Sequence, residues 1–180
     1  MDNAGEVRAW RPAPDSVHLL RTTQQVQYQL SQMADQKASI LLGITFVIFT
    51  ISLSQAQRAS PPVPLMVLGA AAFFAALLTV MAVLPSVQKP PRIGDKGGNV
   101  LFFATYTQMS EDDYVRHMLD ITCDHEKVFE TFIRDIHQNG CVLARKKYKL
   151  LGYAYRVLLA GMVASLVAFI APYVTEWISG

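Results

Sequence analysis

The stretch ASILLGITFVIFTISL, residues 38–53, decides the fold class of this chain. No Asp, Glu, Lys or Arg occurs between Ala38 and Gln57, and apolar side chains lie all round a helix built from these residues. A helix of about 20 apolar residues crosses the hydrocarbon core of a bilayer, which is about 30 Å thick. Backbone amides in lipid must bond within their own segment, which favours a helix. The sequence therefore predicts a transmembrane helix over residues 38–57.

Two more charge-free stretches, residues 59–88 and 157–175, predict two further spans, over residues 65–84 and 153–175. A buried helix of a soluble bundle would instead show polar residues along one face, and these stretches show none. The chain as a whole is 52% apolar and 17% charged, below the roughly 25% charged residues of ordinary soluble domains. We predict an all-α membrane protein with three transmembrane helices, a helical N-terminal segment over 1–37 and a mostly helical segment over 85–152.

The Lys and Arg residues alternate between the predicted loops and indicate the orientation of the chain. The N-terminal segment to Lys37 holds four, the loop between the first two spans holds only Arg58, and residues 89–156 hold eleven. None follows Arg156. Positively charged loops remain in the cytoplasm. We therefore expect a cytoplasmic N-terminus and 85–152 segment, a periplasmic C-terminus and insertion in the inner membrane.

The segment between the second and third spans contains helix signals and one ambiguous stretch. Ser110 with Asp113 three residues later is typical of a capping box. Asp124 is expected to cap a long helix, which could bend at Gly140. Asn99–Met109 is either a strand or a segment packed on a helix. A linker is expected from the residues Pro90, Pro91, Gly94, Gly97 and Gly98.

Few residues in this chain suggest catalysis. Two cysteines and two histidines could in principle bind zinc, but their spacing does not match the paired patterns of zinc sites: Cys123, His125, His137 and Cys141. No phosphate-binding glycine loop and no serine nucleophile motif occurs. The sequence therefore predicts no catalytic residue, no metal site, no cofactor and no enzymatic activity.

Two groups of charged residues lie at the entrances of the predicted spans. A basic cluster precedes the third span and could hold lipid headgroups or an anionic ligand such as a nucleotide phosphate: Arg145, Lys146, Lys147 and Lys149. Asp35 and Lys37 stand at the entrance of the first span. Lys37 could extend into the headgroup region while Asp35 stays in water, or Asp35 could pair with a basic residue near the third span.

A family resemblance extends over residues 18–172 and is carried by several short strings, two of which contain the charged residues above. The chain resembles the transmembrane effector family of Pycsar antiphage systems at the strings LSQMADQKASILLG (30–43), NVLFF (99–103), SEDDY (110–114), RDI (134–136), LARKKYKLL (143–151) and YR (155–156). The resemblance implies activation by cyclic UMP or cyclic CMP from a neighbouring pyrimidine nucleotide cyclase. It also implies that the activated effector impairs the inner membrane and causes abortive infection.

The expected function is therefore that of a ligand-gated membrane effector. The basic cluster is the candidate ligand site, and Asp35 and Lys37 are the candidate coupling residues. Three spans are too few to enclose a pore, so a homo-oligomer is expected, with close helix approach at small residues such as Gly69, Ala75 and Gly161. The alternatives are a structural or accessory inner-membrane protein that anchors a partner complex, and a metal-dependent membrane hydrolase.

Overall fold

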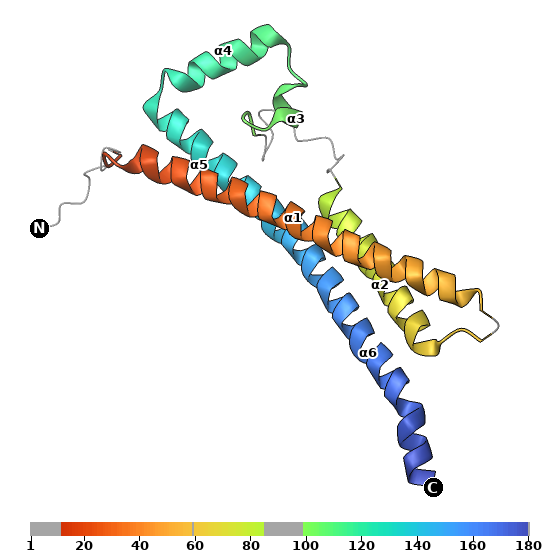
Figure 1. The fold of residues 1–180 in the computed structure, drawn as a ribbon. Coiled ribbons are helices and arrows are strands. Elements are labelled where there is room, and N and C mark those ends of the chain that lie inside the picture. The colour runs from red at the N-terminus through yellow and green to blue at the C-terminus, as the bar shows by residue number, and fades with distance from the viewer. Residues whose placement is uncertain (1–11, 59, 85–98, 180) are drawn as a thin grey trace, which may run out of the picture. The chain divides into compact units, whose positions relative to one another are not determined.

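The computed structural model describes residues 12–58, 60–84 and 99–179, and all regular elements in these ranges are helical (Figure 1). Three helical segments are long and apolar enough to cross a membrane: Ser16–Ala56, Val63–Val83 and the continuous stretch His125–Ile178. The predicted all-α class with three membrane helices is confirmed. The elements are α1 (Ser16–Ala56), α2 (Val63–Val83), α3 (Phe103–Tyr106), α4 (Glu111–Thr122), α5 (His125–Val142), the π-helix η1 (Leu143–Tyr148) and α6 (Lys149–Ser179).

The chain divides into two compact units. The first contains the described residues up to Gln29 and those from Asn99 to Cys141, which include α3, α4 and α5. The second contains Leu30 to Leu84 and the residues from Val142 onward, which include α2, η1 and α6. Helix α1 contributes residues to both units. The charge-free stretches all belong to the second unit.

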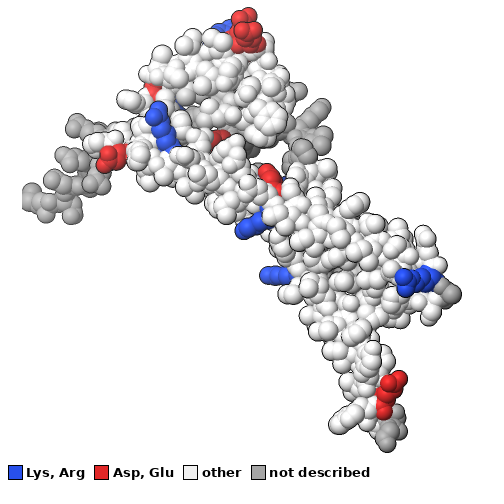
Figure 2. All heavy atoms as spheres, viewed as in Figure 1, with Lys and Arg blue, Asp and Glu red and all other residues white. Residues whose placement is uncertain are grey.

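In the second unit, α1 and α2 form a helical hairpin, and α2 packs along α6 (Figure 1). The buried side chains of α1 and α2 recur at intervals of three, four or seven residues, as expected when one face of each helix is covered by its neighbours. Figure 2 shows a broad surface over these helices with charged side chains only near its margins. The buried core consists of small and medium apolar residues: Ala38, Leu41, Ala72, Ala75, Leu151, Ala154 and Leu158.

Glycines at two helix contacts allow the backbones of the second unit to approach closely. A β-carbon added to Gly69 would overlap Ser52, and one added to Gly161 would overlap the β-carbon of Ala71. The sequence predicts that small residues such as these let helices approach closely. For Gly69 and Gly161 this prediction is confirmed between helices of one chain.

Hydroxyl groups in the apolar core bond to the helix backbone. Thr45 Oγ1 donates to the carbonyl of Leu41 at 2.8 Å, and Thr79 Oγ1 donates to the carbonyl of Ala75 at 2.7 Å. Both threonines are 0% exposed. A hydroxyl bonded to its own helix adds no unsatisfied polar group to lipid or to the core.

The first unit confirms both helix caps. Ser110 Oγ accepts the amide of Asp113 at 3.2 Å, and Asp124 Oδ1 accepts the amide of Glu126 at 2.9 Å. The ambiguous Asn99–Met109 stretch forms turns and the short helix α3, so no strand occurs in this stretch. The expected linker of prolines and glycines lies outside the described residues. The predicted bend at Gly140 is not where the helix becomes irregular, because Gly140 lies within α5 next to Gln27. The α-helix changes into a π-helix at η1 instead.

Candidate functional site

The candidate site is η1, which lies within the third long helical stretch, where the helix widens into a π-helix just before α6. Three of the four predicted anion-binding residues lie in η1, and Lys149 is the first residue of α6. π-Helical turns are rare, and they occur frequently at functional sites. No proline or glycine lies within Leu143–Tyr148 to cause the irregular turn. The wide turn coincides instead with a group of contacts made by three consecutive η1 side chains.

Lys147 makes the central contact, an ion pair with α1. Its ammonium Nζ lies 2.8 Å from both carboxylate oxygens of Asp35 and 2.9 Å from the hydroxyl oxygen of Ser31. The Lys147 side chain is 23% exposed and the Asp35 side chain 44%. The sequence offered this pairing as an alternative to a solvated Asp35, and the structure shows the pair.

The neighbours of Lys147 form further hydrogen bonds within the second unit. Tyr148 Oη donates to the carbonyl of Leu30 at 3.1 Å, and Lys146 Nζ donates to the carbonyl of Leu84, just beyond α2, at 2.6 Å. Six residues into α6, Tyr155 Oη donates to the carbonyl of Lys37 at 3.4 Å. The π-helix is therefore bonded to both other membrane helices or their immediate ends.

Arg145 and Lys149 differ from Lys146 and Lys147 in having no such contact. Both side chains are exposed, and within the described part of the chain neither makes a hydrogen bond or an ion pair. The Lys37 side chain is exposed as well. The basic cluster thus consists of two cations bound within the chain and two that face outward. Only the outward pair can meet an anion without first breaking a contact of the fold.

A second polar centre, in the first unit, surrounds the buried carboxylate of Asp135, which is 4% exposed. Its Oδ1 accepts from Asn99 Nδ2 at 2.7 Å and from Asn139 Nδ2 at 2.9 Å. Its Oδ2 accepts from Gln24 Nε2, on α1, at 3.1 Å. Three neutral amides thus satisfy a buried charge, which would be costly without such partners.

Two residues extend this amide-lined centre. Asn99 Oδ1 accepts the amide of Leu101 at 2.9 Å, which fixes the turn before α3. Gln27 Nε2 donates to the carbonyl of Ile136 at 2.9 Å, so α1 and α5 are bonded at two successive turns. Sequence reasoning did not find this centre. The available signal was the carboxylate of Asp135, which lies three residues after Phe132 on the otherwise apolar face of its helix.

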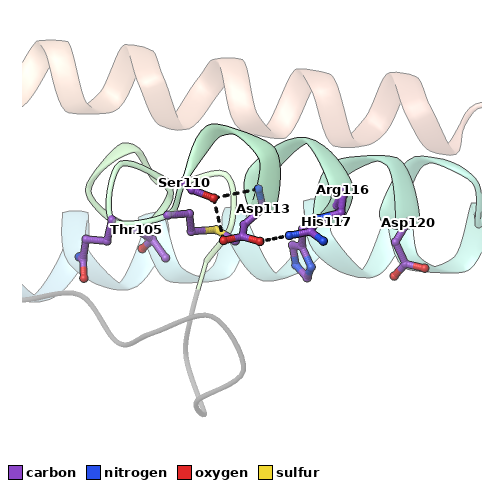
Figure 3. A pocket seen from close by; sticks show the side chains of 8 residues that line it. Thr105, Ser110, Asp113, Arg116, His117 and Asp120 are labelled. Atoms are coloured by element: carbon purple, nitrogen blue, oxygen red, sulfur yellow. Dashed lines mark hydrogen bonds and ion pairs between the residues drawn. The ribbon is translucent and has the colours of Figure 1, made fainter.

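The first unit also carries an open hollow of about 770 Å³ beside α3 and α4 (Figure 3). Asp113 lies in it and is bonded to Ser110 and Arg116 (Figure 3). The Ser110 hydroxyl, followed by the Arg116 guanidinium, holds the pKa of the Asp113 carboxyl below its ordinary value. A hydrogen bond from Lys127 likewise lowers the pKa of Asp120. Two carboxylates beside one guanidinium make this hollow a poor site for an anion.

The four cysteines and histidines do not form a metal site among the described residues, where no three potential ligands cluster. Cys141 Sγ lies 3.8 Å from His137 Nε2, one helical turn away. Cys123 and His125 are exposed at the junction of α4 and α5. Nothing in this arrangement supports the metal-dependent hydrolase.

Comparison with known proteins places the site in a family. No curated protein and no solved structure matches the chain. The family model of the Pycsar effector protein domain, PycTM, matches residues 18–172, a range that includes η1, the Asp35–Lys147 pair and the Asp135 centre. Its three membrane-spanning helices make the chain a multi-pass membrane protein. The chain belongs to the Pycsar effector family, the membrane effectors of an antiphage defence system.

Proposed function

We propose that a cyclic pyrimidine nucleotide, cyclic UMP or cyclic CMP, activates this effector, and that the activated effector impairs the inner membrane without catalysing a reaction. The infected cell then dies or stops growing before phage mature, which is abortive infection. The family match over residues 18–172 is the observation that carries this proposal, because it spans the three membrane helices and the basic cluster together. The N-terminus and the first unit face the cytoplasm, where a cyclase would release the messenger, and the C-terminus faces the periplasm.

The outward-facing cations of the basic cluster are the proposed ligand contacts. A cyclic nucleotide carries one negative charge on its phosphodiester, and guanidinium and ammonium groups bind phosphate oxygens through charge-assisted hydrogen bonds. Arg145 and Lys149 are exposed and are therefore the first groups that an arriving phosphate meets. Lys146 and Lys147 complete the proposed site once the phosphate draws them from their contacts within the chain.

Competition for Lys147 is the proposed link between ligand and membrane. The ammonium of Lys147 is shared by Asp35 and Ser31 of α1. A phosphate at η1 offers Lys147 another anion, and so weakens the bond between η1 and α1. A ligand shifts a conformational equilibrium only if it binds one state more tightly. In this mechanism the favoured state is the one in which the Asp35–Lys147 pair is open, and Lys37, two residues further along α1, moves with Asp35.

The lesion itself requires more than one copy of the chain. In the second unit α2 packs along α6, and the core is closed by side chains such as Leu41, Ala75 and Leu158. Within the described residues of this unit, the core cluster is apolar and offers no polar path for ions. We therefore propose that a homo-oligomer, together with the surrounding lipid, forms the site of membrane damage.

Dye release from proteoliposomes tests this proposal. The purified full-length chain is reconstituted in vesicles loaded with a fluorescent dye, and cyclic UMP, cyclic CMP or cyclic AMP is added. We expect dye release with one pyrimidine nucleotide and not with cyclic AMP. The double variant Arg145→Ala, Lys149→Ala should need at least about tenfold more nucleotide, which corresponds to about 1.4 kcal/mol.

The matched control is Arg134→Ala, which removes an exposed cation of α5 that pairs with Glu130 on its own helix. This variant should respond as the unaltered chain does. An equal loss in both variants would show that overall charge, not the η1 site, matters. No release with any cyclic nucleotide would contradict the proposed activation and would favour an accessory role at the membrane.

A further inference from the structure

One face of the first turns of α6 carries exposed cations with an aromatic ring between them. Lys149 and Arg156 are exposed, and Tyr153 between them is 44% exposed. Residues four and seven positions apart lie on the same face of an α-helix, so these three residues form one surface, which we call the cationic stripe. The buried residues of the same turns, such as Leu151 and Ala154, belong to the core. The cationic stripe therefore faces away from the packing of the second unit.

The chain supplies no counter-ion to the cationic stripe. In the sequence, no Asp or Glu occurs between Asp135 and Glu176. Among the residues that the structure describes, Lys149 and Arg156 form neither an ion pair nor a hydrogen bond. The guanidinium of Arg156 lies near the Tyr153 ring, with Cζ 6.0 Å from the ring centroid. A guanidinium beside an aromatic ring keeps its N–H donors available to an anion.

Arg156 lies where the hydrocarbon of the bilayer meets the headgroups. The charge-free stretch from Val157 to Thr175 begins directly after it. At about 1.5 Å per residue this stretch is about 28 Å long, close to the roughly 30 Å of a hydrocarbon core. Along the same helix, Tyr153 lies about 5 Å and Lys149 about 10 Å further from the hydrocarbon. The headgroup layer is about 5–7 Å thick on each side, so the cationic stripe extends across it.

An apolar groove between α2 and α6 continues from the cationic stripe into the hydrocarbon. Leu159 and Val163 follow Arg156 by three and seven residues and are 62% and 57% exposed. The one polar side chain that lines the groove is Ser165, and its Oγ donates to the carbonyl of Pro64 at 2.8 Å. The groove has a volume of about 670 Å³, and its lining includes Leu65, Leu68, Leu159 and Val163.

We infer that the cationic stripe binds the phosphate of an anionic phospholipid, with an acyl chain of the same lipid in the apolar groove. The guanidinium of Arg156 donates to the phosphate oxygens, and Lys149 adds a second positive charge at the outer edge of the headgroups. Tyr153 belongs to the aromatic side chains that lie at headgroup level. A zwitterionic lipid could fill the same groove, but its own positive charge would be repelled by the two cations.

The depth of Arg156 favours a lipid over a soluble anion as the source of the phosphate. A lipid phosphate is held at the edge of the hydrocarbon by its own acyl chains, whereas a dissolved phosphate must leave water to reach that level. The inference goes beyond the proposed activation by a nucleotide. The cationic stripe shares only Lys149 with the proposed nucleotide contacts, and it can be tested with no nucleotide present.

Lipid retention by the purified chain tests the inference. The full-length chain is purified in detergent micelles, and phosphatidylglycerol or phosphatidylcholine with the same acyl chains is added. Native mass spectrometry then measures the fraction of chains that carry a lipid. We expect several-fold more bound phosphatidylglycerol than phosphatidylcholine. Arg156→Gln should weaken the binding of phosphatidylglycerol about fivefold, which corresponds to the roughly 1 kcal/mol that one cation contributes near a membrane surface.

Three further variants separate the site from overall charge and from folding. Arg156→Lys keeps the charge and should retain more phosphatidylglycerol than Arg156→Gln. Lys149→Gln should also weaken binding, and because Lys149 is exposed and makes no bond within the described chain, this variant decides the test if Arg156→Gln does not fold. The matched control is Arg58→Gln, which removes an exposed cation between α1 and α2 and should retain phosphatidylglycerol as the unaltered chain does.

Several results would overturn the inference. One is equal retention of the two lipids by the unaltered chain, and another is an equal loss in Arg58→Gln and the variants of the cationic stripe. Unchanged retention in both Arg156→Gln and Lys149→Gln would do so as well. Displacement of phosphatidylglycerol by dissolved glycerol 3-phosphate would show a site for soluble anions instead of a lipid. Since no cyclic nucleotide is present, a failed dye-release experiment would leave this result standing, and a failed lipid test would leave activation standing.

Discussion

The two units of this chain are stabilised by opposite kinds of interaction. The first unit holds α1, α5 and the turn before α3 around a buried charge, Asp135, which three amides satisfy. The second unit holds its helices by close backbone approach at Gly69 and Gly161 and by bonds at its polar end. One unit depends on hydrogen-bond geometry, and the other depends on steric fit.

The solvent of each unit accounts for the difference. In lipid no hydrophobic effect drives helices together, so small residues that allow close packing become the main source of association. In water, apolar burial supplies the driving force, and a buried polar centre adds geometric specificity at a cost in stability. The charged messenger proposed above would therefore compete with polar contacts such as the Asp35–Lys147 pair, but not with the glycine contacts.

The largest effect is expected from Asp135→Ala in the first unit. This change leaves the amides of Gln24, Asn99 and Asn139 without their acceptor, and hydrogen bonds to a charged group are worth about 1.5–3 kcal/mol each. We expect residues 99–141 to lose protection in hydrogen-exchange mass spectrometry of the full chain in detergent. Asp135→Asn, which keeps one acceptor oxygen, should lose less.

The control for this change is Glu130→Ala on the same helix. Glu130 is exposed and pairs with Arg134 one turn away, and such pairs contribute about 0.2–0.5 kcal/mol. Its removal should leave the exchange pattern almost unchanged. If Asp135→Ala were as mild as Glu130→Ala, the amide-lined carboxylate would not be what holds the first unit together.

A single added methyl group tests the second unit. Gly161→Ala places a β-carbon where the β-carbon of Ala71 already lies, so α2 and α6 must move apart. Overpacking of this kind typically costs about 1–3 kcal/mol. Unfolding of the full chain in mixed micelles, followed by circular dichroism, should show that loss.

Two other glycines of the membrane helices serve as matched controls. Gly43 and Gly152 have open space around the position of a β-carbon. Because alanine has a higher helix propensity than glycine by about 1 kcal/mol, alanine there should be neutral or stabilising. Equal destabilisation at Gly43 and Gly161 would show that backbone freedom, rather than steric fit, makes glycine necessary.

This contrast also explains which features the sequence could predict. The three membrane helices follow from long stretches without charged residues. This is a property of local composition and does not depend on which segments pack nearby. The caps at Ser110 and Asp124 follow from local spacing. In both cases the energetic cause lies within a few residues, so the sequence displays it directly.

The features that the sequence could not predict depend on pairs of residues far apart. Nothing near Asp135 indicates that Gln24, more than one hundred positions away, will bond to it. The partner of Gly161 is Ala71 on α2, which is also remote in the sequence, so the sequence does not show which helix this glycine faces. The basic cluster was visible as a cluster, but its division into bound and outward-facing cations depends on which of them α1 and α2 reach.

Loss of the Asp35–Lys147 pair should lower the free energy of unfolding less than Asp135→Ala or Gly161→Ala does. Both groups are partly exposed, so solvent reduces their attraction, and a coupling energy of about 0.5–1 kcal/mol is expected. A double-mutant cycle with Asp35→Asn and Lys147→Met, measured by unfolding in micelles, isolates this energy. Lys149→Met should show no coupling to Asp35→Asn. A cycle with no coupling at Lys147 would remove the proposed link between ligand and membrane.

The smallest effect is expected at the exposed carboxylate of Asp113 in the first unit. Substitutions of its two partners test which contact keeps this carboxylate in its charged form. Its pKa lies below the ordinary value because Ser110 and Arg116 bond to the charged form. A lowered pKa in the folded state means that the contribution to stability is complete above the ordinary pKa of an aspartate and is lost as the pH falls through the lowered value. Ser110→Ala and Arg116→Ala should each raise the pKa of Asp113 in a carboxyl-resolved NMR titration, since the Ser110 hydroxyl and then the Arg116 guanidinium bond to the charged form. Salt should weaken only the Arg116 contribution, because screening acts on the ion pair and not on a hydrogen bond from a neutral hydroxyl. No rise from Ser110→Ala, with a rise from Arg116→Ala that salt abolishes, would mean that charge attraction alone, and not the helix cap, lowers the pKa of this carboxylate.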